Sequence, residues 1–338
     1  MSEYSARIDD LVLEFGNGAN AVRALDGVTL DVAAGSILGI VGESGSGKST
    51  VGFAMGRLVP QGVFPKSGRL EVLGKQVWEL DINEMRRMRT QDVRYVFQDP
   101  IATLDPTKPI GWQVANSLET PLGEAEVLSA LADVGMPQPA RVAASWPHEL
   151  SGGMAQRVVI AMALVGRPKL IIADEATSAL DASVRTRILE LMREQSRKRG
   201  ITLLILSHDL WAVRMFCDNI AVMYGGRVVE HGPAARVFAA PAHPYTRALL
   251  AATAGHEKPG EKLNTIPGIP PLLRGASPGC AFAPRCEFAR EDVAGKQCSA
   301  DRPVLDDKEP GWNLLCHHWR SLSVVNGKKG MGEDHGAA

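Results

Sequence analysis

Short apolar runs alternate with amphipathic stretches along most of the chain, from about Leu11 to Val237. Five of the runs are rich in β-branched side chains and bounded by breakers, which is typical of strands buried on both faces of a sheet. These predicted strands are Ile37–Val41, Val93–Phe97, Leu170–Ala173, Thr202–Leu206 and Ile220–Tyr224. The predicted helices are Lys48–Leu58, Met154–Val165 and Ser183–Lys198. This alternation indicates an α/β domain with a largely parallel core sheet.

The character of the chain changes near residue 240. The stretch from Ala240 to Pro278 is rich in proline and glycine, and a segment that carries cysteines follows it. We place a domain boundary near residue 255, so that residues 1–255 form the main domain, 256–325 a small C-terminal domain and 326–338 a frayed tail. No long-period repeat is visible, which predicts one copy of the main domain.

Composition narrows the classes of protein that fit. The 338 residues carry a net charge of −1, which argues against a protein that coats nucleic acid, and we expect no nucleic-acid partner. The N-terminus lacks the pattern of a secretory signal, and no apolar run reaches the roughly 18 residues of a membrane span. Any role at a membrane is therefore expected to depend on a partner.

The first chemical motif lies between the first predicted strand and the first predicted helix. Residues 42–49 fit the pattern G-x4-G-K-[ST], whose glycines let successive backbone N–H groups face phosphate oxygens at a helix N-terminus. Lys48 is placed to reach the β- and γ-phosphates of a nucleotide, and the Ser49 hydroxyl to bind Mg²⁺. The predicted ATP-binding residues here are Gly42, Glu43, Ser44, Gly45, Ser46, Gly47, Lys48, Ser49 and Thr50.

The predicted strand Leu170–Ala173 runs into two carboxylates, Asp174 and Glu175. A buried strand would deliver Asp174 beside the Mg²⁺ ion, and Glu175 could then polarise the attacking water. Many strands end in acidic residues, so this signal gains its weight from the phosphate loop that precedes it.

A third motif, Leu150-Ser-Gly-Gly-Met-Ala-Gln156, resembles the signature of the ABC transporter ATPases. Its Ser-Gly-Gly start would open a helix with free N–H groups, a second anion site in the same chain. In that family the signature of one subunit closes over the phosphate loop of its partner. The resemblance thus implies that Ser151, Gly152, Gly153 and Met154 act in trans.

Further positions follow the order of the same family. Gln98 matches the loop that contacts Mg²⁺ and senses the transmembrane partner, and His208 matches the residue that contacts the γ-phosphate. Ser178 and Asp181 match the loop that crosses the dimer interface. Phe15 stands where the family places an aromatic side chain that stacks on adenine, although it could equally be a core residue. The resemblance implies that Glu175, His208, Lys48 and Gln98 are the catalytic residues.

Several segments resemble one branch of this family, the dipeptide and oligopeptide permease ATPases: Leu104–Pro106, His148–Glu149, His243–Leu250 and Ile266–Gly268. The resemblance implies an ABC cassette with a RecA-like parallel core, an antiparallel β subdomain, a helical signature subdomain and a cysteine-rich extension. It implies an ATP-hydrolysing subunit that energises peptide uptake. Nickel and opine importers share the branch and stay open as alternatives.

The same branch implies a set of partners. The chain would be the D-type ATPase in a head-to-tail dimer with a homologous F-type ATPase, beneath two transmembrane permease subunits fed by an extracytoplasmic substrate-binding protein. It would lie peripherally on the cytoplasmic face of the bacterial inner membrane. The surface over residues 100–118 is expected to receive a permease helix. Rival classes are a soluble ABC ATPase, an exporter ATPase and a regulatory iron–sulfur module.

Four of the five cysteines cluster near the C-terminus, which in a chain without a leader indicates metal rather than disulfides. Cys280, Cys286, Cys298 and Cys316 are separated by 5, 11 and 17 residues, which is not the paired C-x2-C spacing of a zinc ribbon. Their surroundings resemble the segment in which some peptide-permease ATPases carry a [4Fe–4S] cluster, with about five extra residues between the second and third cysteine. Zn²⁺ and free thiols remain alternatives, with His317 and His318 as possible ligands.

Overall fold

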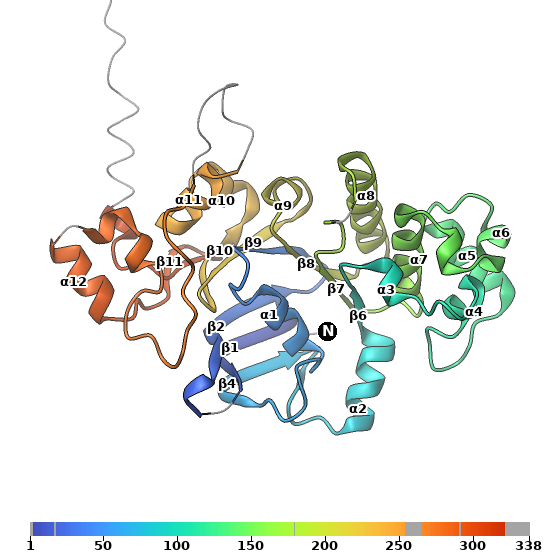
Figure 1. Ribbon diagram of the computed structural model, residues 1–338, viewed down its shortest axis with the longest axis horizontal. Helices are drawn as coiled ribbons and strands as arrows, with labels where there is room; N and C mark the ends of the chain where they lie inside the picture. The colour runs from blue at the N-terminus through green and yellow to red at the C-terminus, as the bar shows by residue number, and fades with distance from the viewer. Residues whose placement is uncertain (1–2, 17, 179, 254–264, 291, 322–338) are drawn as a thin grey trace, which may run out of the picture.

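The five predicted strands lie side by side in one sheet of the computed structural model, which describes residues 3–16, 18–178, 180–253, 265–290 and 292–321 (Figure 1). Their order is β9-β3-β8-β7-β6, and every neighbouring pair is parallel. Their bounds are β3 Ile37–Val41, β6 Val93–Val96, β7 Leu170–Asp174, β8 Thr202–Ser207 and β9 Asn219–Tyr224. The predicted parallel core is confirmed.

Both faces of this sheet are buried, which explains why its strands are continuous apolar runs rather than alternating ones. On β8, Leu203 and Ile205 pack into a core cluster with the helices of one side. Leu204 and Leu206 pack into a second cluster with the antiparallel strands of the other side. The strand ends that carry the predicted site residues therefore rest on a rigid layer.

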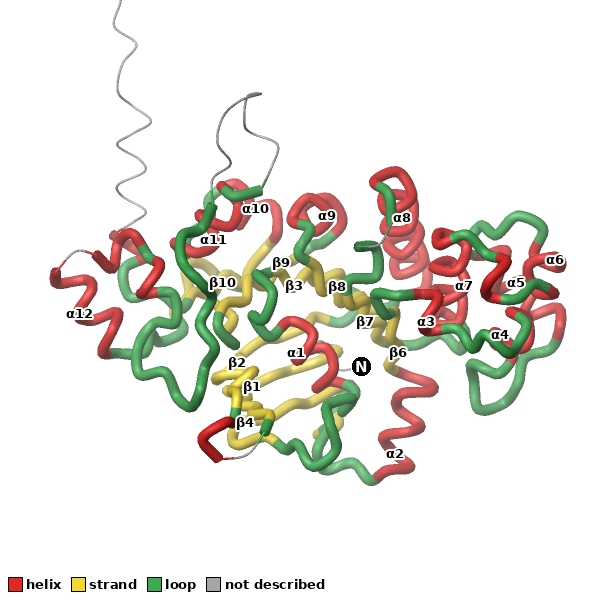
Figure 2. Tube along the Cα trace, viewed as in Figure 1, coloured by secondary structure: helices red, strands yellow, loops and turns green. Residues whose placement is uncertain are grey.

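A second, antiparallel sheet covers the lower face, with α1 (Lys48–Met55) between the two sheets (Figure 2). Its strands, in the order β2-β1-β4-β5, are β2 Val22–Ala33, β1 Tyr4–Phe15, β4 Pro65–Val72 and β5 Lys75–Gln76. The short helix η1 (Gly18–Asn20) joins β1 to β2, and α2 (Ile82–Arg87) with η2 (Met88–Asp92) leads back to β6.

The chain between β6 and β7 forms a helical lobe on one side of the sheet (Figure 1). Its elements are α3 Pro100–Thr103, α4 Ile110–Ala115, α5 Glu124–Asp133, α6 Pro139–Ala144, η3 Pro147–Glu149 and α7 Gly152–Leu164. The long helix α8 (Ala182–Arg199) follows β7 and packs against α7. This is the helical signature subdomain that the family resemblance implies.

The C-terminal elements continue the main sheet instead of forming a separate one. Strand β12 pairs with β10, and β11 with β12, which makes the sheet eight-stranded over the described residues. The bounds are α9 Leu210–Phe216, β10 Arg227–Pro233, α10 Ala234–Ala239, α11 Pro244–Ala251, η4 Ala283–Arg285, η5 Glu287–Arg290, α12 Asp292–Ala300, β11 Asp306–Glu309 and β12 Trp312–Leu314.

A buried carboxylate fastens this C-terminal part to the cassette. Glu230 on β10 is fully buried and accepts hydrogen bonds from Trp312 Nε1 at 3.0 Å and from the backbone N–H groups of Ala242 at 2.9 Å and His243 at 3.0 Å. The domain boundary that we place near residue 255 lies outside the described residues. The division at that point stays a prediction.

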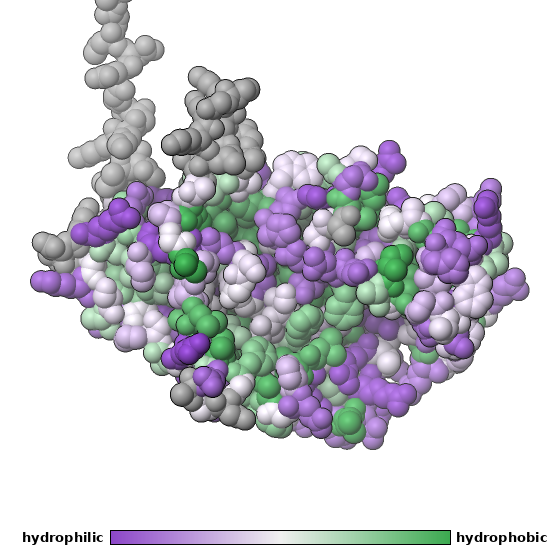
Figure 3. Space-filling model, in the orientation of Figure 1, coloured by the Kyte–Doolittle hydropathy of each residue, from purple (hydrophilic) through white to green (hydrophobic). Residues whose placement is uncertain are grey.

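Within the described ranges, no helix is long and apolar enough to cross a membrane. The face in Figure 3 shows hydrophobic residues over the middle of the molecule, where α1 and the antiparallel sheet lie, and mostly hydrophilic side chains over α5 and α6.

Candidate functional site: a nucleotide pocket and a cysteine cavity

An open pocket of about 610 Å³ lies at the carboxyl ends of the parallel strands. Ligands of open α/β sheets bind at this edge. Of the predicted ATP-binding residues, those that line it are Phe15, Ser44, Gly45, Ser46, Gly47, Lys48, Ser49, Thr50, Gln98, Asp174 and His208, and the predicted catalytic Glu175 lines it too. The structure thus gathers residues that the sequence scatters over nearly 200 positions.

Glycine is required at two positions of the phosphate loop. Gly42 and Gly47 have φ angles of 154° and 102°, which side chains rarely adopt. A Cβ atom at Gly42 would lie 2.2 Å from the Met223 carbonyl oxygen, and one at Gly47 would lie 2.7 Å from that of Ala24. Both glycines let the loop curl tightly before α1 begins at Lys48, as predicted.

Polar groups inside the loop are held for an anionic ligand. The buried Lys48 Nζ donates to the carbonyl oxygens of Gly42 at 2.8 Å and Glu43 at 3.1 Å. Burial lowers the pKa of Lys48, although Glu175 and Asp174 act in the opposite direction. Ser46 Oγ is buried and has no hydrogen-bond partner among the described residues. The Lys48 ammonium, which here donates to carbonyl oxygens, and the unpaired Ser46 hydroxyl could both bind a phosphate group.

Two hard oxygen ligands meet beside the loop. Ser49 Oγ donates to Asp174 Oδ1 at 3.0 Å, which joins α1 to the end of β7. Burial raises the pKa of Asp174, with Ser49 acting against that rise. A hydroxyl and a carboxylate at this separation, with Gln98 in the same pocket, are the donor types that Mg²⁺ prefers.

Glu175 and His208 form a pair at the pocket's edge, with Oε2 and Nδ1 2.7 Å apart. Glu175 has a φ angle of 49°, which is unusual outside glycine, and its N–H is held by the Leu206 carbonyl at 2.9 Å. Such backbone strain concentrates at functional sites. The arrangement places a carboxylate and an imidazole where a water molecule could be oriented.

Two predicted residues of the loop do not face the cavity. Gly42 and Glu43 offer their carbonyl oxygens to Lys48, and the Glu43 side chain instead binds Arg285, with Oε2 and Nη1 2.6 Å apart. Phe15 lines the pocket and also packs against the core of the antiparallel sheet, so its two predicted roles are compatible.

The predicted trans-acting residues lie away from this pocket. Ser151 caps α7, its Oγ accepting from the Met154 N–H at 3.4 Å, so Gly152 opens the helix as predicted. Asp181 caps α8 in the same way. Ser178 Oγ donates to the Glu175 carbonyl at 2.9 Å, which ties its loop to the catalytic candidate. The described part of the pocket's wall includes none of Ser151, Gly152, Gly153, Met154, Ser178 or Asp181.

The sequence analysis missed part of the pocket wall. Two further stretches and a proline-rich segment complete it: Val22, Arg23, Ala24, Gly225, Gly226, Pro271, Leu272 and Leu273. The repeated prolines of the segment 266–273 mark an extended chain, but nothing in the pattern shows where that chain lies.

The four C-terminal cysteines converge on a second, small cavity of about 20 Å³. Cys280 and Cys286 come from the turn around η4, Cys298 from α12 and Cys316 from the chain after β12. Burial raises the pKa of Cys298 to about 11 and of Cys316 to about 12, and it also raises the pKa values of Cys280 and Cys286. The convergence brings together the four predicted ligands.

No group of three or more His, Cys, Asp or Glu in the described residues is arranged to hold a single metal ion. Three histidines line this cavity, His243, His317 and His318, and of these His317 Nε2 bonds the Asp301 carbonyl oxygen at 2.9 Å. His318 Nε2 is buried and has no hydrogen-bond partner among the described residues. The nature of the bound group, if any, stays a prediction.

Two known protein families match this chain, one in the cassette and one in the C-terminal part. The ABC transporter family matches residues 25–178, and the family "Oligopeptide/dipeptide transporter, C-terminal region" matches residues 229–292. The Dipeptide transport ATP-binding protein DppD of Escherichia coli (strain K12) is 37% identical, covering 92% of this chain and 95% of the relative. The Oligopeptide transport ATP-binding protein OppD of Haemophilus influenzae is 41% identical, covering 84% of this chain and 90% of the relative.

Solved structures show the same cassette. The ATP-binding cassette MJ0796, in a dimeric post-hydrolysis state bound to ADP and Pi, is 27% identical with a TM-score of 0.60, covering 68% of this chain and 98% of that one. CbiO1 from Clostridium perfringens is 30% identical with a TM-score of 0.62, covering 70% and 92%. The chain is therefore an ATPase of the ABC transporter family, one that carries the oligopeptide/dipeptide transporter C-terminal region.

Proposed function

We propose that this chain hydrolyses ATP to drive the import of dipeptides or oligopeptides through permease subunits. The observation that carries the proposal is the pocket in which the phosphate loop, Asp174 and the Glu175–His208 pair meet, in a chain whose relatives are named as peptide transport proteins. Nickel and opine-type cargo are the alternatives, because cargo is selected outside this subunit.

In the proposed mechanism, Lys48 and the loop N–H groups bind the phosphates of ATP. Ser49, Asp174 and Gln98 would hold Mg²⁺, and the ion would supply positive charge to balance that of the phosphates. Glu175 accepts a hydrogen bond from the attacking water and orients it, and His208 binds the γ-phosphate. The 2.7 Å contact between Glu175 and His208 keeps both groups at the same edge of the pocket before ATP arrives.

The proposal includes a dimer of ATPases. Ser151–Met154 lie at a helix start outside the chain's own pocket, which suits a role over the nucleotide of a homologous, F-type partner. A single cassette would then be incomplete, and the D-loop residues Ser178 and Asp181 would lie at the joint interface. A substrate-binding protein outside the membrane completes the proposed assembly, at the cytoplasmic face of the inner membrane.

The permease would dock on the surface formed by residues 100–118. Two large apolar side chains are exposed there, Ile101 at 44% and Trp112 at 49%. We propose that these two side chains form part of the contact with the permease, where their apolar surface would be buried. Substitution of these residues therefore tests the proposed assembly.

The test uses the complete transporter, co-expressed with its partner ATPase and permeases and reconstituted in vesicles. ATP-dependent uptake of labelled di- and tripeptides, with no uptake of nickel, supports the proposal. Trp112→Glu is expected to abolish co-purification with the permeases, whereas Trp211→Glu, at a tryptophan of α9 that is 48% exposed and lies outside the helical lobe, is the matched control. Nickel uptake without peptide uptake would overturn the proposed cargo. Normal assembly of Trp112→Glu would overturn the proposed docking surface.

We also propose that the cysteine cavity holds a [4Fe–4S] cluster with a structural role. Four thiols from three separate segments and the unpaired His318 Nε2 surround it. Cysteine thiolates, commonly four, hold iron–sulfur clusters, and four cysteines line this cavity. Zn²⁺ is the alternative.

Anaerobic purification tests this cofactor. The cluster predicts absorbance near about 400 nm and about four irons per chain. Cys286→Ser should lose the iron, and Cys217→Ser, at a cysteine outside the cavity, should keep it. Stoichiometric zinc, or no metal in the anaerobic protein, would contradict the proposal.

A further inference from the structure

The segment 266–273 reaches the nucleotide pocket with its last three residues. Pro271, Leu272 and Leu273 line the same cavity as Phe15 and Val22. The Leu273 carbonyl accepts a hydrogen bond from the Arg23 N–H at 2.9 Å, so the segment lies against the start of β2. Figure 1 shows this chain, in orange, descending beside β2 after α11.

Leu272 is 64% exposed although it is apolar and faces a binding pocket. Figure 3 shows hydrophobic side chains recurring along the strip of surface that the segment occupies. Ile269 is even more exposed, at 88%, but it is not part of the pocket's wall. Both residues are exposed and apolar, but only Leu272 lines the pocket, so Ile269 serves as a control for Leu272.

One guanidinium holds both the start of this segment and the phosphate loop. The buried Arg285 donates to the carbonyl oxygens of Ile266 at 3.1 Å and Pro267 at 2.8 Å. It also binds both carboxylate oxygens of Glu43, at 2.6 and 3.1 Å. This bidentate pairing fixes the segment relative to the loop, because planar fork-to-fork geometry restricts rotation.

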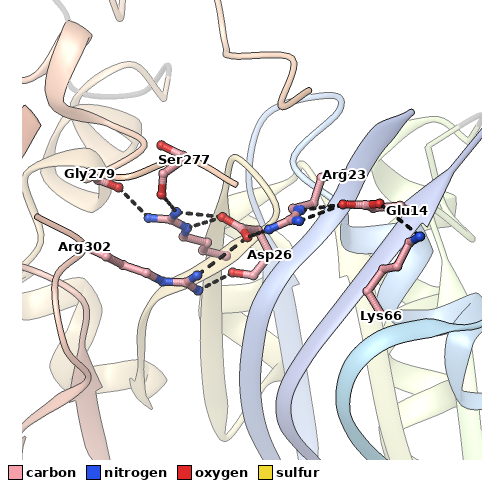
Figure 4. Close-up of polar contacts among 8 residues, drawn as sticks. Glu14, Arg23, Asp26, Lys66, Ser277, Gly279 and Arg302 are labelled. Carbon is pink, nitrogen blue, oxygen red and sulfur yellow. Dashed lines mark hydrogen bonds and ion pairs between the residues drawn. The ribbon is translucent and has the colours of Figure 1, made fainter. Parts of the chain in front are cut away.

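The chain that follows the segment is fixed as well, at Ser277 and Gly279 (Figure 4). The buried Arg227 binds Asp26 Oδ2 through Nε at 2.9 Å and Nη2 at 2.6 Å, and it donates to the carbonyl oxygens of Ser277 at 3.0 Å and Gly279 at 2.8 Å. Asp26 lies on β2 and also binds Arg23, Nη1 to Oδ1 at 2.9 Å. A wall held at both ends is preorganised for a ligand.

The lining of the pocket differs from end to end. Apart from Arg23, which lies beside Val22 and Leu273, its charged side chains are Lys48, Asp174, Glu175 and His208, where phosphates and Mg²⁺ belong. Its apolar side chains come from Phe15, Val22 and the segment Pro271–Leu273. Apolar and aromatic walls suit a flat heteroaromatic ring.

We propose that Pro271–Leu273 form a wall of the base-binding subsite, with Leu272 in contact with the nucleobase of ATP in the same subunit. This deepens the proposed function and rests on it. The C-terminal region is then part of the nucleotide site as well as an appendage of the cassette.

Equilibrium binding to the full chain separates the base from the phosphates. The probes are MgATP and magnesium tripolyphosphate, which has the phosphates but no base. Leu272→Ser should weaken MgATP binding about fivefold and leave tripolyphosphate binding unchanged. Leu272→Met should restore the affinity for MgATP, and Ile269→Ser should bind both probes as the unmodified chain does.

Each outcome bears on a separate claim. If Leu272→Ser binds MgATP as tightly as the unmodified chain, or loses both probes equally, the base-contact proposal is wrong. If the unmodified chain binds neither probe, the proposed ATP site itself fails. A thermal unfolding curve shared by Leu272→Ser and Ile269→Ser excludes misfolding as the cause of any difference.

Discussion

The nucleotide pocket and the cysteine cavity both include residues from the part of the chain after residue 265, but they differ in how their polar groups are held. The nucleotide pocket is open and about 610 Å³, and its charged groups have hydrogen-bond partners such as the Ser49–Asp174 and Glu175–His208 pairs. The cysteine cavity is about 20 Å³ and enclosed by thiols whose pKa values burial raises.

The nucleotide pocket is therefore preorganised, whereas the cysteine site needs its ligand to complete its structure. Groups that already hold each other keep their places when the pocket is empty. Buried neutral thiols must lose protons to bind metal, so metal binding and the packing of the surrounding segments are coupled. The two sites are therefore expected to respond differently to substitution, and the variants below test that difference.

The largest effect is expected where the two sites are joined. Asp26→Ala would leave the buried Arg227 without its carboxylate, and breaking such a pair costs about 3–5 kcal/mol. Denaturant unfolding of the full chain measures the loss. Asp31→Ala, at an exposed carboxylate on the same strand, is the control, with a change below about 0.5 kcal/mol. Equal stabilities of the two variants would show that the network in Figure 4 does not hold the regions together.

A large effect confined to the nucleotide pocket is expected from Glu175→Gln. It removes the carboxylate that orients water while keeping the size of the side chain, so ATP turnover of the assembled transporter should fall roughly 10²- to 10³-fold. MgATP should still bind, and the iron content should stay unchanged. Glu190→Gln, on α8, is the control. Turnover near that of the unmodified transporter would remove Glu175 from its role.

A smaller effect is expected from Arg285→Ala, because Arg285 positions Glu43 and the segment 266–273 without lying in the pocket's wall. The apparent affinity for MgATP should fall about fivefold, with turnover at saturating ATP nearly unchanged. Arg285→Lys should recover part of the affinity, and Arg290→Ala, at an exposed arginine of η5, should change nothing. A loss of turnover with unchanged affinity would contradict this positioning role.

The sequence predicted the parts of the site that local spacing determines. The phosphate loop, Asp174 and Glu175 each follow an apolar strand, and the sheet brings their strand ends together whatever the rest of the chain does. The start of α7 was equally predictable, because Ser151 and two glycines form a helix cap by themselves.

Contacts between distant segments could not be predicted in this way. Glu43 and Arg285 are 242 positions apart, and no sequence motif next to either residue indicates that they pair. The same holds for Leu272, whose place in the pocket depends on where Arg285 and Arg227 hold its segment. The convergence of the cysteines was expected from the family resemblance, whereas their spacing alone left the ligand open.

The most direct test of the ATP site is MgATP binding to the full chain with and without the Lys48 ammonium. The account predicts that Lys48→Ala weakens binding about 100-fold, because the buried Lys48 ammonium lies inside the phosphate loop and would pair with the phosphates. Lys75→Ala, at an exposed lysine, should bind as the unmodified chain does. Equal affinity of the Lys48→Ala and unmodified chains would contradict the assignment of this pocket to ATP.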